Sequence, residues 1–486
     1  MASNNEKLSV SIERSEKKKV IVENPNEVRG SSTAPAVIVD ERERSTVTTE
    51  RSPKWFLPIL VEVAETHQTR TKELMHKVPT FLRSIENHKG CFDPMAVSIG
   101  PYHHGKKEVA KVEKLKAEIA KDFIGEDIEK LDWFEEVARN ARACYYYDDE
   151  EEGSLNKWKD DQFTRMMFLD GCFILYIISC QGDNKLNSNT KLKPYQMAFV
   201  SRDLFLLENQ LPFLVLEELM KLKDKVNDWH QRIQKFVTNR TNLCSSNTTK
   251  SFVDQNDDRH AHLLDLLHKT LSGVGKDSGS QQRNNDSHTF RSVIELKAAG
   301  IRFKKSNHGG NLEDVKFELH SWYGNVFLPP LIIDDLTRSS FLNLAAYEAC
   351  PDGPSDSLVT SYICFLDALI DRAEDVKELR SKGILHNLLG SDEKVAELFN
   401  ELANQLVPSQ STQYSIVMND IERFYKLKWF RWAREFCSTH FRSPWTAFAL
   451  FVGAALILLT FVQTYFAVFP VKGEEERRAP RTIRYS

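Results

Sequence analysis

Two adjacent histidines, His103 and His104, form the most chemically suggestive pair in this chain of 486 residues. They lie in Gly-Pro-Tyr-His-His-Gly, where glycine and proline predict a tight loop. Imidazoles can ligate a metal ion or act as a general base. A zinc site needs three or four convergent ligands, and the sequence shows no such partner set. The simpler interpretation is a loop whose imidazoles bind local backbone groups.

A second polar group, Glu208, Asn209 and Gln210, lies just before Pro212 in an apolar run. Polar side chains in such a run need hydrogen-bond partners if they are buried. They could line a recognition pocket or stabilise the helix break expected at Pro212, and we favour the structural role. An enzyme of unfamiliar class would instead bring them together with the paired histidines in a polar, concave pocket.

Three histidines accompany an expected short helix at 260–271, namely His260, His262 and His268. On a helix, positions i and i+2 point to different faces, and i and i+8 lie about 12 Å apart. We therefore predict no metal site there.

Asp367, Asp371 and Asp375 recur every fourth residue of an expected helix. Helical spacing holds three carboxylates too far apart for one hard cation without further ligands. A solvated acidic face, paired with nearby basic residues, is the simpler interpretation.

Known catalytic and cofactor motifs are missing from the sequence. It contains no GxxxxGK[ST], GxGxxG, GxSxG or HExxH pattern. The net charge of -4 gives no electrostatic footprint for nucleic acid. The eight cysteines are scattered without metal-type spacing, and we expect reduced core thiols. No catalytic residue, cofactor or metal is predicted.

The elements that position these residues are mostly helices. Apolar residues recur at helical spacing over 107–142, where Gly125 divides two helices, and 160–180 is apolar enough for a central buried helix. The run 201–224 is expected to begin at an N-cap, Ser201 or Asp203, and to break at Pro212. Further helices are expected at 339–350, 361–383, 393–407 and 415–441, and a few short strands between 291 and 334.

The fold class is therefore mainly α. We expect one large α-helical globular domain over residues 53–440, with a few short β-strands and mobile loops at about 239–290. Residues 1–52 are polar and poor in aromatic side chains, which predicts a disordered arm. Residues 470–486 form a short charged tail.

Residues 445–469 carry no charged side chain. A helix of that length reaches roughly 37 Å, and a hydrocarbon core is about 30 Å thick. The pattern predicts a single transmembrane helix in the lipid bilayer. Its expected anchor residues are Trp445, Leu450, Gly453, Leu456, Leu459, Phe461 and Tyr465. Ala449 and Gly453 form a small-xxx-small pair through which the chain could form a homo-oligomer.

The side of the membrane that the domain faces stays open. The N-terminus has no apolar signal region, so post-translational insertion as a tail anchor would leave the domain in the cytosol. Basic residues flank both ends of the span almost equally. The sequons at Asn239, Asn247 and Asn285 would matter only for a lumenal domain. The basic, aromatic stretch 415–441 could lie on an anionic leaflet or pack on the domain.

Several segments occur in the order typical of one plant family. They include KVPTFLRSIE (77–86), VSIGPYHHG (97–105), DLFLLENQLPF (203–213), HLLDLLH (262–268), LPPLIIDDLTRSSFLNLAAYE (328–348) and FRSPWTAFALFVGAALILLTFVQT (441–464). The chain resembles the DUF247 (UPF0481) proteins of unknown function. The resemblance implies membrane attachment through the C-terminus and no established enzymatic activity. It supplies no catalytic residues. Grass members are tied to pollen–stigma self-incompatibility, which implies recognition for some of the family.

Together these features predict a membrane-anchored plant protein of unknown molecular function, leaning toward a non-enzymatic interaction protein with an unidentified protein partner. An extracellular-facing recognition protein and an enzyme of unfamiliar class remain the alternatives.

Overall fold

A computed structural model describes fifteen parts of the chain. They are residues 10–12, 20–22, 46–47, 75–125, 133–145, 155–182, 191–222, 226–241, 243, 260–272, 291–306, 311–320, 322–409, 413–426 and 444–468. The described residues leave out most of the predicted arm 1–52. They also leave out the charged tail and the sequons at Asn247 and Asn285. The predictions made for these segments stay predictions. Within the arm, three short strands pair antiparallel: β1 (Val10–Ile12), β2 (Val20–Val22) and β3 (Thr46–Val47).

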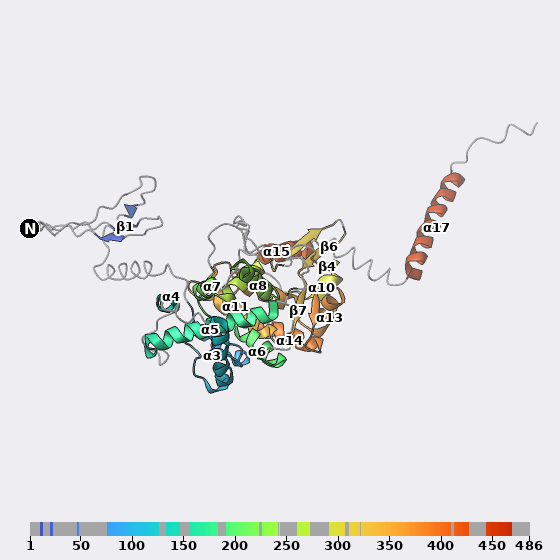
Figure 1. Cartoon of the computed structure of the whole chain (residues 1–486). Coiled ribbons are helices and arrows are strands. Elements are labelled where there is room, and N and C mark those ends of the chain that lie inside the picture. The colour runs from blue at the N-terminus through green and yellow to red at the C-terminus, as the bar shows by residue number, and fades with distance from the viewer. Residues whose placement is uncertain are drawn as a thin grey trace, which may run out of the picture.

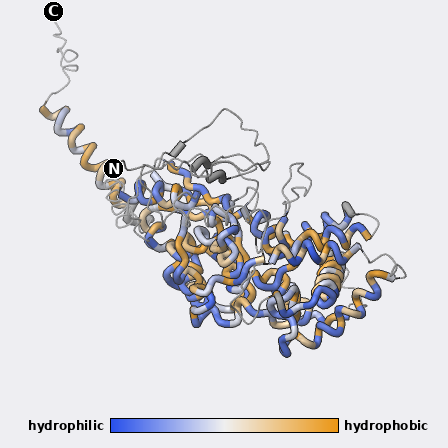
Figure 2. Tube along the Cα trace, turned by 90° about the vertical axis from the view of Figure 1, so that its left-hand side faces the viewer, coloured by the Kyte–Doolittle hydropathy of each residue, from blue (hydrophilic) through white to orange (hydrophobic). Residues whose placement is uncertain are grey.

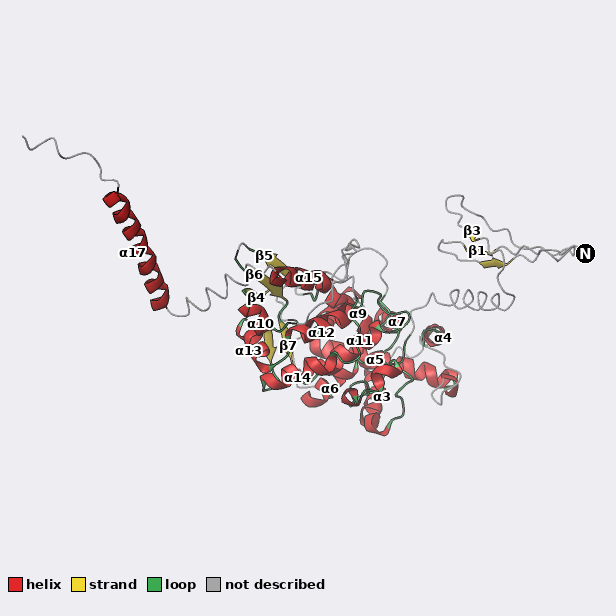
Figure 3. Ribbon diagram, turned by 180° about the vertical axis from the view of Figure 1, so that it is seen from behind, coloured by secondary structure: helices red, strands yellow, loops and turns green. Residues whose placement is uncertain are grey.

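Residues 75–426, called the body below, are mainly helical, as predicted (Figures 1 and 3). At the centre of its first half lies α5 (Asp160–Gly182), which is packed by helices on several sides. That environment explains why its sequence is apolar nearly all round. The other helical elements of this half are α2 (Thr80–Arg83), η1 (Glu86–His88), η2 (Lys107–Val109), α3 (Ala110–Ile124), α4 (Phe134–Arg142), η4 (Leu155–Lys157), α6 (Pro194–Asp203), α7 (Phe213–Lys221) and α8 (Val226–Thr238).

The second half of the body adds helices and two small sheets. Its helices are α9 (Leu263–Ser272), α10 (Val293–Ala298), α11 (Thr337–Glu348), α12 (Leu358–Leu369), α13 (Ala373–Ser381), α14 (Asp392–Leu402) and α15 (Gln413–Lys426). Buried apolar side chains from Met75 to Phe424 form a continuous cluster through both halves.

Short strands were predicted between residues 291 and 334, and four strands that the structure describes in the body lie there, whereas the strand Leu385–Asn387 was not predicted. β4 (Ile301–Lys305), β5 (Lys316–Leu319) and β6 (Gly324–Leu328) form a sheet in the order β4-β6-β5, with β4 parallel and β5 antiparallel to β6. After Pro329 and Pro330, β7 (Leu331–Ile333) pairs in parallel with β8 (Leu385–Asn387). The two prolines lack N–H donors, which accounts for the end of the first sheet.

Two helix predictions were wrong in detail. The expected helix 361–383 is two helices, α12 and α13, because the chain becomes extended at Ile370 and Arg372. Asp375 is buried there, and its carboxylate accepts the N–H groups of Asp371 and Arg372. The three aspartates therefore do not share one solvated helix face.

The second error concerns the expected N-cap at Ser201 or Asp203. These residues end α6, and α7 begins only after Pro212, where the break was predicted. Asp203 caps no helix, because its carboxylate faces a different segment of the chain.

The last described element is α17 (Pro444–Val468), an exposed apolar helix. Figure 2 shows mainly hydrophobic residues along it, and Figure 1 shows it apart from the other labelled helices. Among the described residues, two helices are long and apolar enough to cross a membrane, Asp160–Gln181 and Phe448–Val468. In the first helix, 61% of the most apolar 18-residue stretch is buried in the protein, and in the second helix 0% of it is buried.

Candidate functional site

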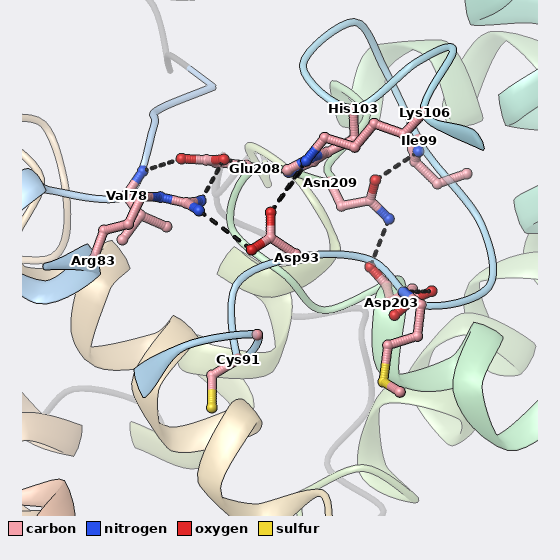
Figure 4. A network of polar contacts seen from close by, with 12 residues as sticks. Val78, Arg83, Cys91, Asp93, Ile99, His103, Lys106, Asp203, Glu208 and Asn209 are labelled. Carbon is pink, nitrogen blue, oxygen red and sulfur yellow. Dashed lines mark hydrogen bonds and ion pairs between the residues drawn. The ribbon is translucent and has the colours of Figure 1, made fainter. Parts of the chain in front are cut away.

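Residues 89–106 have little regular structure, yet much of this loop is buried. Side chains from the end of α6 and the loop before α7 satisfy its backbone (Figure 4). Asp203 Oδ2 accepts the N–H groups of Met95, Ala96 and Val97 at 2.9, 2.6 and 3.0 Å. Arg202 Nη1 donates to Asp203 Oδ1 at 3.0 Å. Burial raises the pKa of Asp203, although these N–H groups and Arg202 oppose the rise.

Asn209 and Gln210 make similar bridges between chain segments. Asn209 Oδ1 accepts the N–H of Ile99 at 2.7 Å, and its amide nitrogen donates to the carbonyl of Val97 at 3.1 Å. Gln210 Oε1 accepts the N–H of Leu264, at the start of α9, at 3.1 Å. Both side chains are buried, so these bonds satisfy groups that would otherwise be costly to bury.

Glu208 is the acidic centre of the network. Its Oε1 accepts the N–H of Val78 at 2.8 Å, and its Oε2 lies 2.6 Å from Arg83 Nη2 and 3.2 Å from His103 Nε2. Burial alone would raise the pKa of Glu208. The contact with His103, the charge of Arg83 and the Val78 N–H together hold that pKa below its usual value. The carboxylate therefore stays ionised in the folded protein.

Asp93 extends this network toward solvent. Its carboxylate lies 3.5 Å from Arg83 Nη1, 3.1 Å from Lys106 Nζ and 3.9 Å from His103 Nδ1. The cations outweigh partial burial and lower the pKa of Asp93. Figure 4 shows Glu208 and Asp93 on either side of the Arg83 guanidinium.

The paired histidines separate in space. His103 is buried beside Glu208, whereas His104 Nδ1 lies 3.9 Å from Glu113 Oε2 and its ring packs edge-on against Trp158 at 5.0 Å. The structure thus brings His103 and Glu208 together, as the enzyme interpretation required, and places His104 elsewhere. The contacts of Glu208, Asn209 and Gln210 join the loop 89–106 and the start of α2 to the helical core, which favours a positioning role.

A buried ion pair beneath the same loop was not anticipated. Lys116 Nζ, fully buried, lies 2.6 Å from Asp170 Oδ1, 2.6 Å from Glu113 Oε1 and 2.5 Å from the carbonyl oxygen of Ser98. Asp170 Oδ2 also accepts the N–H of Gly100 at 2.8 Å. Sequence alone showed Asp170 only as an interruption of an apolar helix.

A cleft of about 390 Å³ lies elsewhere, between α9 and the turn that connects α11 to α12. It is lined by Ala261, Asp265, His268, Lys269, Ser272, Tyr347 and residues 352–356. At its wall, His268 Nε2 lies 2.7 Å from Glu348 Oε1. Spacing within one helix could not predict this cluster, because eighty residues separate the two partners.

The predicted anchor residues lie along α17. Leu450, Leu456, Leu459, Phe461 and Tyr465 are exposed, and Gly453 has open space around its Cα. The side chain of Trp445 lies outside the described side chains. Of the sequons, Asn239 is exposed just after α8.

Comparisons with known proteins point to one family. A family profile described as "Plant protein of unknown function" (DUF247) matches residues 75–459, which include the body and part of α17. The chain is 29% identical over 415 residues to the UPF0481 protein At3g47200 of Arabidopsis thaliana, covering 78% of this chain and 83% of that protein. It is 22% identical over 486 residues to the putative UPF0481 protein At3g02645 of the same plant, covering 79% and 88%. No solved structure matches the chain.

The matched region contains both the loop 89–106 and the side chains that hold it. Four of the segments that carry the family resemblance, 77–86, 97–105, 203–213 and 262–268, are thus in direct contact in the fold. Because the profile covers more than half of the sequence, this chain belongs to the DUF247 family of plant proteins of unknown function.

Proposed function

We propose that this protein is a membrane-anchored, non-enzymatic interaction protein, in which α17 crosses the bilayer and the body binds a protein partner. The observation that carries this proposal is the contrast between an apolar helix with an exposed surface and a body with a continuous core.

The chemistry of α17 supports the anchor. Its most apolar 18-residue stretch is 0% buried by the protein, so the apolar surface needs a non-aqueous environment. The hydroxyls of Thr460 and Thr464 donate to carbonyls one turn earlier, at 2.8 Å each. Such internal bonds are what hydrocarbon demands of polar groups in a spanning helix.

The body supports the interaction role. The polar network around Glu208 fixes the loop 89–106 as part of a rigid surface, because its contacts tie chain segments together. Exposed aromatic side chains, Tyr195 and Trp322 among them, offer the residue types enriched in protein interfaces. We propose that this surface faces the cytosol.

Extraction of the full chain from membranes at alkaline pH tests the anchor. We expect the wild-type protein in the membrane pellet and Leu456→Arg/Leu459→Arg in the soluble fraction. A matched Leu456→Ala/Leu459→Ala variant should stay in the pellet. Release of the wild-type protein by carbonate would refute the proposal.

An extracellular-facing recognition protein is the second candidate. Exposed Asn239, in Asn-Arg-Thr at the end of α8, favours it, since a glycan there would not clash with the core. Treatment of the native protein with a glycosidase separates the two topologies. A mobility shift that Asn239→Gln abolishes would support the extracellular body, and an unchanged mobility supports the cytosolic one.

A further inference from the structure

Three potential metal ligands converge at the wall of the cleft described above. His268 comes from α9, Glu348 ends α11, and Asp356 lies in the turn before α12. One ligand atom from each lies within 4.8 Å of the others. His268 Nε2 is 2.7 Å from Glu348 Oε1 and 3.9 Å from Asp356 Oδ1. An ion bound at about 2.0–2.2 Å from each atom needs separations of this order.

The two inner ligands are already oriented. Glu348 Oε1 and Oε2 accept the N–H groups of Val359 and Thr360 at 2.7 and 2.8 Å, in the first turn of α12. The second lone pair of Oε1 faces His268 Nε2, so an ion bound between these two atoms would replace their hydrogen bond. His268 is 2% exposed, which fixes its ring against the cleft wall.

The third ligand provides access. The side chain of Asp356 is 50% exposed and can move toward an ion with little cost. Asp356 belongs to the turn between α11 and α12, whose residues 352–356 line the cleft. This turn ends at Ser357, whose φ of 44° is in the left-handed region. The cleft is wide enough for water to complete the coordination sphere and for the ion to exchange with solvent.

The local charge favours a cation. The cleft is lined by three carboxylates, those of Asp265, Asp352 and Asp356, and by one ammonium group, that of Lys269. A fourth carboxylate, that of Glu348, lies at the cleft wall, so negative charges outnumber positive ones. This excess of negative charge around His268 attracts a cation.

We propose that His268, Glu348 and Asp356 form a binding site for a divalent transition-metal ion of the Zn²⁺ class, completed by water. One imidazole nitrogen with two carboxylate oxygens suits Zn²⁺ or Mn²⁺ better than Mg²⁺ or Ca²⁺, which prefer all-oxygen sites. The bound ion joins α9 to the connection between α11 and α12. The site is independent of membrane anchoring and of the Glu208 network.

A titration with Zn²⁺ tests the site. The full chain is held in detergent micelles, a chelator first removes bound metals, and the number of ions bound per chain and their affinity are then measured. Wild-type protein should bind one ion more per chain than His268→Gln. Asp356→Asn should weaken that site by at least about 10-fold, since even outer contacts of metal sites change affinity by about 10- to 100-fold. Asp352→Asn is the matched control, because Asp352 lines the same cleft without belonging to the triad. It should change the affinity by much less than the roughly 10-fold expected of Asp356→Asn.

A second measurement keeps the test independent of ion counting. Saturating Zn²⁺ should raise the thermal unfolding midpoint of the wild type and of Asp352→Asn, and leave that of His268→Gln unchanged. The exposed Asp356 makes Asp356→Asn compatible with folding, which circular dichroism checks. Equal stoichiometry and affinity in wild type and His268→Gln, or equal weakening in Asp352→Asn and Asp356→Asn, would overturn the proposal.

Discussion

The two long apolar helices, α5 and α17, are alike in length, are both apolar enough to cross a membrane, and differ in what surrounds them. α5 is covered by α3, α4, α7 and α8 and contains Asp170, whose charge is matched by buried Lys116. α17 contains no charged residue and exposes its apolar side chains. A helix that must pack in a protein can hold an ion pair, whereas one that faces lipid cannot hold an unpaired charge cheaply.

The comparison shows that hydropathy alone does not identify a membrane span. Asp170 marks α5 as a core helix because only a protein interior supplies both Lys116 and the N–H of Gly100. Under the proposed function α17 attaches the protein to the membrane, whereas the contacts of α5 and of the loop 89–106 stabilise the body. Changes in one region should therefore leave the property of the other unchanged.

The largest expected effect is on membrane attachment. An arginine at the centre of a span costs about 3 kcal/mol, so Leu456→Arg/Leu459→Arg should nearly abolish insertion. The measurement is the membrane-bound fraction of the full chain. Proteolysis should show the same protected body fragment as in wild type, and loss of that fragment would break the separation between the two regions.

The next effect removes the charge partner of α5. Lys116→Met leaves Asp170 as an uncompensated buried charge, which should reduce the free energy of unfolding by roughly 3–5 kcal/mol. Urea unfolding of the full chain in detergent measures it. Lys114→Met, exposed on the same helix α3, is the matched control and should stay within about 0.5 kcal/mol of wild type. Similar losses in both variants would contradict the assignment.

A pH effect of comparable size concerns His262. Desolvation lowers the pKa of this buried side chain from its usual 6.5 to about 4. The unfolded chain therefore binds a proton that the folded chain does not, between those two values. The contribution of neutral His262 to the free energy of unfolding is fully present above pH 6.5. It is lost as pH falls toward 4, and the total loss is about 3 kcal/mol.

Unfolding experiments between pH 4 and 7 check this effect. His262→Leu should flatten the dependence of unfolding free energy on pH, and replacing the exposed His386 by leucine serves as control. An unchanged slope in His262→Leu would show that other groups cause the acid sensitivity. Membrane attachment through α17 should not vary over this range.

The smallest effect concerns the network around Glu208. Glu208→Gln keeps an acceptor for the N–H of Val78 but loses the charge opposite Arg83, which should cost about 2 kcal/mol. Because the folded pKa of Glu208 is lowered, its stabilisation is present at neutral pH and is lost as pH falls through that pKa. Thermal unfolding should show no such loss for Glu86→Gln, an exposed residue paired with Lys89.

Much of the fold was predictable because it depends on local patterns. Apolar periodicity located α3, α5 and α14, Gly125 ended α3 with a positive φ, and Pro212 preceded α7. The mainly helical class follows from such signals. Local patterns do not predict the start of α13. The chain becomes extended at Ile370, after α12, and the carboxylate of Asp375 then accepts the N–H of Arg372 at the start of α13.

The candidate sites were less predictable because their contacts are long-range. Glu208 and His103 were named together, but Arg83, whose guanidinium contacts the Glu208 carboxylate, lies 125 residues from Glu208. The proposed ligands His268, Glu348 and Asp356 come from three elements. Spacing within one helix excluded a metal site at His268, because the helix alone does not show the distant carboxylate of Glu348. Tertiary packing, which no single-segment pattern encodes, decides both cases.

The most direct test of the contrast between α5 and α17 uses the unmodified full chain in bilayers that contain a photoactivatable group in the lipid acyl chains. After illumination, mass spectrometry locates the lipid adducts along the sequence. The account predicts adducts in residues 444–468 and none in residues 160–182. Adducts within α5, or none within α17, would contradict it.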